Sequence, residues 1–329
     1  MLQVGDIDIG APVLLAPMAG ITDRPYRELV AGFGAGLVVS EMVASQEVLA
    51  GNRDALARAE VAAGAVGTSV QIMGRDPVLM AEAARLVVGE GAEIVDINMG
   101  CPARKVTSGA GGSALMREPG LALEIIQSVV GAIEVPVTLK MRLGWDANSL
   151  NAAELAFRAE QLGIRMITVH GRTRCQFYNG PADWKAIKPV VDAVDIPVIA
   201  NGDIVDGPSA AKALSLSGAA GVMVGRGAIG RPWILAEIAA ALEGRNLKMR
   251  PIGANFGELV GRHARAHMAF HGERTGVRAM RKHLDAYIGQ VPNARDLRDR
   301  LIRETDPNEL FRGFQELGRR DAEVAQWAA

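Results

Sequence analysis

Short apolar runs alternate with helix-favouring, alanine-rich stretches about eight times along most of this chain. The runs are rich in Val, Ile, Leu and Met, and they begin near Val13, Leu37, Ser69, Ile94, Val137, Met166, Pro197 and Gly221. Between them lie stretches that favour helix, such as residues 77–88, 120–130, 152–162 and 209–216. This order, over roughly the 250 residues that such a fold needs, favours a closed barrel over an open doubly wound sheet. We therefore predict an α/β fold of the (β/α)8 type, a TIM barrel.

The pattern changes after Gly244, where the apolar strands stop and helical stretches with Arg and His continue. Residues 243–246 favour a turn, and residues 248–256 suit either a linker or a lining strand. We therefore predict a catalytic barrel over residues 1–243 and a smaller all-helical domain over residues 244–329.

The composition limits the class of protein. With 329 residues, of which 49% are hydrophobic and 22% charged, the chain can bury one large core. Its start lacks a basic region followed by a long apolar stretch, and no apolar run is long enough to span a bilayer. Its two cysteines make no disulfide framework. We therefore expect a cytoplasmic protein with reduced thiols, no membrane association and no evident protein partner.

One of the two cysteines stands where a predicted strand ends. Cys101 and Pro102 come shortly after the apolar run at residues 94–97. Taken alone, a cysteine beside an apolar strand is more often a small core residue. In a barrel, however, side chains at the carboxyl ends of the strands converge on the ligand, and a proline fixes the backbone that presents the sulfur. The position therefore favours a functional thiol.

Two glycine loops follow predicted strands seven and eight, the usual phosphate site of a barrel. They contain Asn201, Gly202, Asp203, Gly225 and Arg226. Backbone N–H groups can approach phosphate oxygens there because glycine has no side chain. Gln71, Lys140 and His170 stand at the ends of strands three, five and six. Their side chains suit the pyrimidine edge, the N1/C2 region and the polar tail of flavin mononucleotide (FMN).

Several short motifs follow one another along residues 11–320. They are Ala16-Pro17-Met18-Ala19-Gly20-Ile21-Thr22-Asp23, Asp96-Ile97-Asn98-Met99-Gly100-Cys101-Pro102, Leu139-Lys140-Met141-Arg142-Leu143-Gly144-Trp145, His170-Gly171-Arg172-Thr173 with Gln176, Tyr178, Gly180, Asp183 and Trp184, Asn201-Gly202-Asp203-Ile204, and Gly225-Arg226-Gly227 with Gly230-Arg231-Pro232-Trp233. This set resembles the tRNA-dihydrouridine synthases, most closely the bacterial DusB (NifR3-like) branch. The resemblance implies an FMN-binding barrel followed by a helical tRNA-binding domain, with NADPH supplying electrons. Such enzymes reduce the C5–C6 double bond of a uridine in the tRNA D-loop to 5,6-dihydrouridine.

The resemblance also implies roles for residues of this chain. Those expected to bind FMN are Pro17, Met18, Ala19, Gln71, Lys140, His170, Asn201, Gly202, Asp203, Gly225 and Arg226. The first three are expected to pack on the isoalloxazine, and Gln71 to pair with its edge. Lys140 and His170 are expected at the flavin ring and its polar tail, and the remaining residues at the ribityl and phosphate groups. Cys101 is then the general acid.

The chemistry of that reaction agrees with a protonated Cys101. Reduced FMN can deliver a hydride from N5 to C6 of uracil, and the negative charge that develops must be quenched by a proton at C5. A thiol of ordinary pKa, about 8.5, stays largely protonated at neutral pH. A nucleophilic cysteine would need a base to form thiolate, and only His170 could approach it in space. We therefore predict an acid rather than a nucleophile.

Other polar side chains at the predicted barrel mouth are candidates for RNA contacts, because the uridine must leave the D-loop stack to enter the barrel. The candidates are Asn98 and Arg172 for the polar edge of the base, and Arg104, Lys105 and Arg142 for nearby phosphates or bases. The alternative for the last three is that they are ordinary solvated loop charges. Cys175 is expected to be structural.

The segment from Arg262 to His283 is strongly basic. It has six Arg or Lys side chains against a single acid, Glu273, in a chain whose net charge is −1. Because the whole chain has no excess positive charge, RNA binding needs a local patch of this kind. We therefore predict that Arg278 and Lys282 contact tRNA phosphates, with a solvated helix face as the alternative.

Three histidines in the same segment recur at helical spacing. His263, His267 and His271 lie four residues apart and so share one helix face. They could bind a metal, but no carboxylate or cysteine nearby in the sequence completes a ligand set. The sequence therefore favours a basic face that contacts RNA, and no metal site is expected.

Two other functions remain open at this point. An FMN barrel oxidoreductase acting on a small pyrimidine such as dihydroorotate would share the flavin site, but it has no need of a basic helical domain. A non-catalytic RNA-binding regulatory protein could keep the fold. The presence of Asn98, Cys101 and Lys140 argues against that second alternative.

Overall fold

Eight parallel strands form a closed barrel in the computed structural model of the chain, which describes residues 2–61 and 68–327. They are β3 (Val13–Leu15), β4 (Val38–Val39), β6 (Thr68–Met73), β7 (Ile94–Met99), β8 (Val137–Arg142), β9 (Met166–His170), β10 (Val198–Asn201) and β11 (Gly221–Val224). β4 pairs with both β3 and β6, which closes the ring, and the short β5 (Val43–Ala44) adds to β6 beyond that pairing. The predicted barrel is therefore confirmed.

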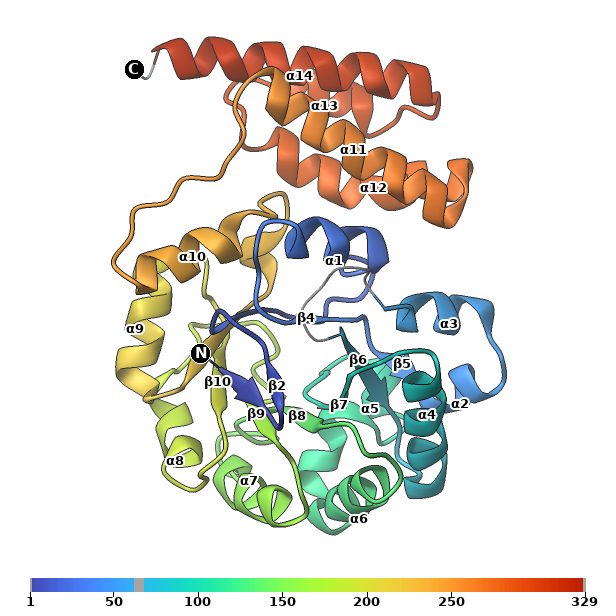
Figure 1. Cartoon of the computed structure of the whole chain (residues 1–329), viewed down its shortest axis with the longest axis vertical. Helices are drawn as coiled ribbons and strands as arrows, with labels where there is room; N and C mark the ends of the chain where they lie inside the picture. Colours follow the sequence, from blue (N-terminus) through green and yellow to red (C-terminus); the bar gives the residue numbers. More distant parts are fainter. Residues whose placement is uncertain (1, 62–67, 328–329) are drawn as a thin grey trace.

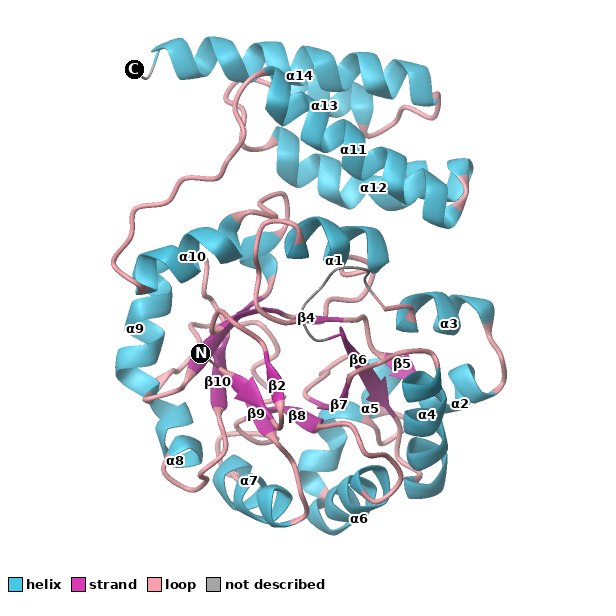
Figure 2. Cartoon of the chain, viewed as in Figure 1, coloured by secondary structure: helices cyan, strands magenta, loops and turns pink. Residues whose placement is uncertain are grey.

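The strands are apolar because they are buried on both sides. All the residues of β7, β10 and β11 are buried, as expected for parallel strands covered by helices. The longer surrounding helices are α1 (Arg24–Ala31), α4 (Pro77–Gly89), α6 (Pro119–Val130), α7 (Ala152–Gln161), α9 (Gly207–Ser217) and α10 (Ile234–Leu242). Shorter ones are α2 (Ser45–Leu49), α3 (Arg53–Ala59), α5 (Arg104–Thr107) and α8 (Lys188–Val191). Figure 2 shows the longer helices as the outer layer of the barrel, whereas α5 lies in the loop that follows β7.

Capping residues explain where several of these helices begin. The side chain of Asp76 accepts hydrogen bonds from the backbone N–H groups of Val78 and Leu79 at the start of α4. Asp206 and Ser209 form a reciprocal capping box at the start of α9. These caps end the loops that carry the strand ends, so they help to position the loop residues.

An N-terminal hairpin covers one end of the barrel. β1 (Gln3–Val4) and β2 (Ile7–Asp8) pair antiparallel, and Leu2, Val4 and Ile9 are buried in a cluster with residues of the strands, such as Met166. The hairpin therefore closes the amino-terminal end and leaves the carboxyl ends of the strands open to ligands.

Four helices follow the barrel. They are α11 (Ala254–His271), α12 (Glu273–Ile288), α13 (Arg295–Leu301) and α14 (Pro307–Trp327). They share an apolar core that includes Phe256, Leu284 and Phe314. Gly257 permits the close packing of α11 on α14, because a Cβ there would meet the carbonyl oxygen of Phe314. No strand lies in residues 243–253, which connect α10 to α11, so the lining strand considered there is absent. The all-helical character is confirmed, whereas the boundary at 243/244 stays a prediction.

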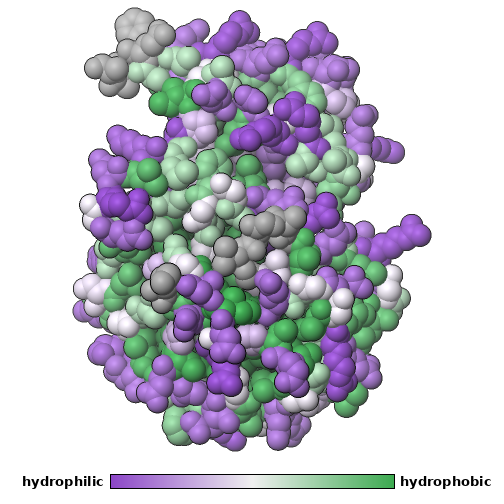
Figure 3. Space-filling model, in the orientation of Figure 1, coloured by the Kyte–Doolittle hydropathy of each residue, from purple (hydrophilic) through white to green (hydrophobic). Residues whose placement is uncertain are grey.

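The helical region contacts the barrel through α1 and α11, which lie next to each other in Figure 1. Figure 3 shows the face that carries the N-terminal hairpin, where hydrophilic and hydrophobic residues are intermixed and hydrophilic ones predominate along the edge formed by the C-terminal helices. Among the described residues, no helix combines the length and the apolar character that a membrane span requires.

Candidate active site at the barrel mouth

A cavity of about 800 Å³ opens at the carboxyl ends of the strands. Its volume lies in the range typical of ligand pockets. The predicted residues that line it are Pro17, Met18, Ala19, Gln71, Asn98, Cys101, Lys140, Arg142, His170, Asn201, Gly202, Asp203, Gly225 and Arg226. The fold therefore brings together side chains from seven strand ends that are far apart in the sequence.

A chain of buried polar side chains supports one wall of the cavity. The Asn98 amide donates to Gln71 Oε1 at 2.7 Å, and Gln71 Nε2 donates to Asp96 Oδ2 at 2.6 Å. The hydroxyl of Thr138 donates to the other carboxylate oxygen at 2.6 Å. Burial raises the pKa of Asp96, while these two donors and Lys140 oppose the shift. The network fixes the orientation of both amides that face the cavity.

Asp96 is a site residue that the sequence analysis did not single out. An acid within the apolar run Ile94–Ile97 was the available signal, because carboxylates are rarely buried without partners.

The Cys101 thiol is presented by a loop that hydrogen bonds hold in place. Asn98 Oδ1 accepts from the backbone N–H of Cys101 at 2.9 Å, and the Ser113 hydroxyl donates to the Cys101 carbonyl at 2.8 Å. Burial raises the pKa of the thiol, while the backbone of Ala103 and the cations Arg142 and Lys140 oppose this. The thiol therefore stays protonated at neutral pH.

Lys140 is a half-buried cation on the floor of the cavity. Its Nζ donates to Asn201 Oδ1 at 3.1 Å. Burial lowers its pKa to about 8, although Asp96 opposes the shift. At pH 7 the ammonium is therefore charged, with capacity for two further hydrogen bonds.

His170 is neutral and incompletely hydrogen bonded. Burial is the main reason that its pKa falls to about 2, and the neighbouring cations, first Lys140 and then Arg142, lower it further. Its buried Nδ1 has no hydrogen-bond partner. A buried polar atom without a partner facing a cavity is the mark of a ligand contact.

The glycine loops have the backbone geometry expected for an anion site. Gly202 has φ +112°, and a Cβ there would meet the His170 ring and Ala182. Asp203 follows with φ +54°, and its carboxylate accepts the backbone N–H of Ala182 at 2.8 Å. Arg226 is 63% exposed and lies 3.5 Å from Asp203. Its guanidinium can therefore turn to a ligand phosphate.

Arg142 joins two loops at the cavity mouth. Its guanidinium donates to three backbone carbonyls, those of Gly100, Thr173 and Phe177, each at 2.8 Å. Burial lowers its pKa to about 10. Arg142 therefore joins the Cys101 loop to the loop after β9, and its predicted contact with RNA phosphate or base stays untested.

Tyr178 is another cavity residue to which the sequence analysis gave no role. Its ring is half exposed, and the guanidinium carbons of Arg142 and Arg226 lie 5.5 and 5.2 Å from its centre. The sequence signal was an aromatic in the loop that follows strand β9, and such a ring can stack on a base.

Five predicted contact residues lie outside the cavity lining. Arg172 is 2% exposed and bound to Asp203 at 2.5 Å, so it supports the glycine loop from behind the cavity wall. Arg104 and Lys105 are exposed on α5, directly after the Cys101 loop. Arg278 and Lys282 are exposed on α12, and Lys282 Nζ lies 3.5 Å from the carbonyl of Gly20 near the mouth. Cys175, expected to be structural, is exposed.

The expectation that the α11 histidines form an RNA-binding face is wrong. His263 and His267 are each 1% exposed, because this face of α11 packs against the barrel. Nor is a carboxylate missing, because Asp23, far away in the sequence, lies 2.7 Å from His271 Nε2.

The cavity residues fit a phosphorylated flavin. Three cations line the cavity, Lys140, Arg142 and Arg226, against the single carboxylate of Asp203. That excess suits an anionic ligand. The partnerless nitrogen of His170 and the side-chain-free approach at Gly202 supply further contacts.

Comparisons with known proteins agree with the motifs. Residues 14–322 match the family model described as dihydrouridine synthase (Dus). A probable tRNA-dihydrouridine synthase of Rhodobacter capsulatus is 57% identical over 93% of this chain and 94% of its own length. The tRNA-dihydrouridine synthase B of Pseudomonas aeruginosa is 44% identical over 93% and 92%. The predicted resemblance is therefore confirmed.

Among solved structures, histamine dehydrogenase from Rhizobium sp. 4-9 matches with a TM-score of 0.52 and 12% identity. The match covers 78% of this chain and 49% of that enzyme, so the chain spans about half its length. This likeness concerns the barrel fold alone.

Proposed function

Because the chain belongs to the dihydrouridine synthase family, we propose that it reduces the C5–C6 double bond of a D-loop uridine in tRNA to 5,6-dihydrouridine. Membership makes it a flavin-dependent oxidoreductase, as the motifs predicted. FMN as the flavin, NADPH as the reductant and action in the cytoplasm are parts of this proposal.

The observation that carries the proposal is a protonated thiol and a half-buried cation in one cavity. Cys101 and Lys140 both line it, and burial keeps the Cys101 pKa above its ordinary value. A reduction of uracil needs both a proton at C5 and stabilisation of negative charge.

When bound, FMN supplies the hydride that adds to C6 of the uracil. The Cys101 thiol donates a proton to C5, and the Asn98 and Ser113 hydrogen bonds hold its backbone in place. The Lys140 ammonium, expected at the flavin ring, stabilises negative charge that develops in the cavity during the reduction. Uracil carries an imide edge that the Asn98 amide, fixed by Gln71, can hydrogen bond.

The remaining cavity residues bind the cofactor in this proposal. Gly202, Asp203, Gly225 and Arg226 hold the ribityl and phosphate groups, because they line the cavity in two neighbouring glycine loops and the Arg226 guanidinium is exposed. Neutral His170 offers its partnerless nitrogen to the polar tail. Pro17, Met18 and Ala19 provide the surface on which the ring packs.

Access of the uridine requires the base to leave the D-loop stack and enter the mouth. Arg278 and Lys282 lie one helical turn apart on α12, and Lys282 reaches the loop after β3. In this proposal they bind tRNA phosphates while the base occupies the cavity.

The test is to map dihydrouridine position by position in tRNA from cells that lack the protein, and to assay the purified protein with NADPH and that tRNA. We expect loss at a defined D-loop position and its restoration by the yellow, FMN-containing protein. Turnover of free uridine or dihydroorotate without tRNA would instead support a small-molecule enzyme. Colourless protein that binds tRNA and leaves dihydrouridine unchanged would support a regulator.

A further inference from the structure

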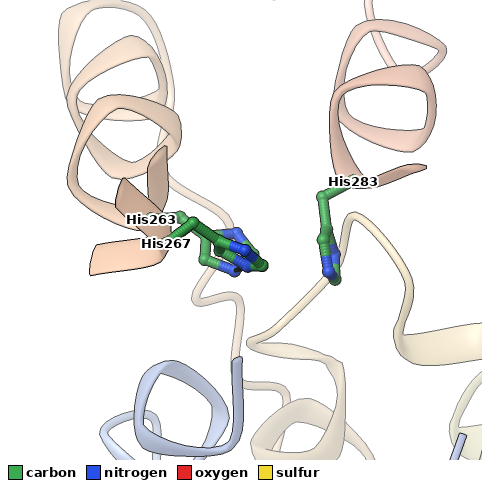
Figure 4. Close-up of side chains that lie close together, drawn as sticks. All are labelled: His263, His267 and His283. Atoms are coloured by element: carbon green, nitrogen blue, oxygen red, sulfur yellow. Dashed lines mark hydrogen bonds between the residues drawn. The ribbon is translucent and has the colours of Figure 1, made fainter. Parts of the chain in front are cut away.

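Four of the five histidines of the chain gather where the C-terminal helices meet the barrel. His263 and His267 come from α11 and His283 from α12, and Figure 4 shows the first two rings on one side and the His283 ring on the other side of the space between the two helices. The potential ligand nitrogens of these three residues all lie within 4.8 Å of one another. The fourth, His271, pairs with Asp23, the residue that caps α1.

The spacing of two nitrogens already suits a common ligand. His263 Nε2 and His267 Nε2 are 3.0 Å apart. Two imidazoles on one tetrahedral zinc ion, each with a bond of about 2.0–2.1 Å, have nitrogens about 3.3 Å apart. A small increase in the distance between the two Nε2 atoms therefore allows both to bind one ion.

The other nitrogen of each ring faces an orienting group. His263 Nδ1 lies 3.2 Å from the Tyr287 hydroxyl, and His267 Nδ1 lies 3.4 Å from Asp23 Oδ2 without making a hydrogen bond to it. Metal-bound imidazoles commonly turn their second nitrogen to a carboxylate or other acceptor in this way. With Nδ1 protonated in both residues, the Nε2 lone pairs point to the same place.

His283 is the strongest sign of a ligand. Its side chain is fully buried, and neither ring nitrogen makes a hydrogen bond of normal geometry, although the ring approaches the backbone of Ile21. Its ring packs on that of Tyr26, with centres 4.7 Å apart. An apolar side chain would fill that space without the penalty of burying two poorly satisfied polar atoms, so packing alone does not explain an imidazole here.

We propose that His263, His267 and His283 form a binding site for a divalent transition-metal ion of the Zn²⁺ class, with water at the fourth position. Nitrogen ligands favour such ions over Mg²⁺ or Ca²⁺. Asp23 orients His267 from α1, so the ion joins α11 and α12 to the barrel. The competing group of Asp23, His267 and His271 is less suitable, because His271 is already bound to Asp23 and is 25% exposed.

The experiment uses the full-length, FMN-containing protein, purified without metal-affinity resin and treated with chelator. Co²⁺ is titrated in as a spectroscopic probe and then displaced with Zn²⁺, while metal content is measured by mass spectrometry. We expect one equivalent per chain, the strong visible absorption of tetrahedral Co²⁺, and its loss on adding Zn²⁺. Saturating Zn²⁺, at about a hundredfold excess over Kd, should raise the midpoint of thermal unfolding by about 4 °C.

Two variants locate the ion. His283→Leu should lose at least tenfold in Co²⁺ affinity and the tetrahedral spectrum, whereas the matched control His271→Leu should keep both. Circular dichroism and flavin content check the fold of each variant. If a variant does not fold, the titration of the wild-type protein still tests the proposal. The proposal is overturned if the wild type binds less than about 0.1 equivalent. It is also overturned if His271→Leu loses the ion and His283→Leu retains it.

Discussion

The barrel mouth and the histidine cluster both bury ionisable side chains, but in opposite ways. In the cavity, Asp96 is fully enclosed and accepts hydrogen bonds from Gln71 and Thr138. In the cluster, His283 is equally enclosed and makes no hydrogen bond of normal geometry. Hydrogen-bond partners within the chain make the cavity wall rigid before any ligand arrives, whereas the polar atoms of His283 are left poorly satisfied.

The largest effect expected in the cavity comes from the thiol. Cys101→Ala should lower the rate of dihydrouridine formation by about 10²–10⁴-fold, because the proton donor is lost. Flavin reduction by NADPH and tRNA affinity should be unchanged, since the hydrogen bonds of residue 101 are made by its backbone. Single-turnover kinetics with each step measured separately provide the check. The matched control is Cys175→Ala, which removes an exposed thiol. Normal turnover in the Cys101 variant would refute the assignment.

The free energy of unfolding distinguishes most directly between a buried polar group with partners, Asp96, and one that is poorly satisfied, His283. Asp96→Asn should lower the free energy of unfolding by about 2 kcal/mol, because an amide cannot accept from both donors as the carboxylate does. His283→Leu in metal-free protein should be neutral or stabilising, because it removes two poorly satisfied polar atoms. Denaturant unfolding of metal-free protein measures both. Asp192→Asn, at a residue in an exposed helical ion pair, is the control and should change little. A large loss in His283→Leu would show that the imidazole has a partner within the chain.

The exposed side of α12 provides a contrast with its buried side. Reversing Arg278 and Lys282 to Glu should weaken tRNA binding by about tenfold and reduce its salt dependence, because two phosphate contacts are lost. NADPH-driven flavin reduction should be intact. Filter binding at several salt concentrations tests this, with Arg312→Glu on α14, 67% exposed, as the control. An equal loss of tRNA affinity in the control would mean that the effect comes from the overall charge of the protein. Unchanged tRNA affinity in the double variant would rule out this face of α12.

The smallest effect expected is a pH dependence of flavin binding. Lys140 has a pKa of about 8 because it is half-buried, so its positive charge is present below that pH and is lost above it. Affinity for FMN should therefore fall by up to about tenfold per pH unit above pH 8. Lys140→Arg should remove this fall. His170 adds no dependence between pH 5 and 7, since its pKa is about 2. Fluorescence titration across pH 6–9.5 is the measurement, and a flat profile in the wild type would contradict the role of Lys140.

Much of the barrel could be predicted because its strands have a strictly local signal. Each strand is rich in apolar residues and is followed by polar or glycine residues, and the barrel topology then places all those ends at one mouth. That reasoning located Cys101, Lys140 and Asn201 in one cavity without any distance information.

Contacts between distant segments could not be predicted in the same way. The helical period places His263 and His267 on one face, but whether that face meets solvent or the barrel depends on tertiary packing. Asp23 and His283 join them only once α1, α11 and α12 are assembled. The ion pair of Arg172 with Asp203 could not be predicted for a related reason: it spans two loops that only the folded barrel brings together.

The hairpin of β1 and β2 has a kinetic consequence for the proposed reaction. It covers the amino-terminal end of the barrel, so ligands reach the cavity from the carboxyl ends of the described strands. A nicotinamide donor and a uridine that both react with the same flavin must then enter from the same side and occupy the cavity one after the other. The donor has to leave before the tRNA base can enter, so the two half-reactions alternate, and initial-rate plots at several fixed tRNA concentrations should give parallel lines.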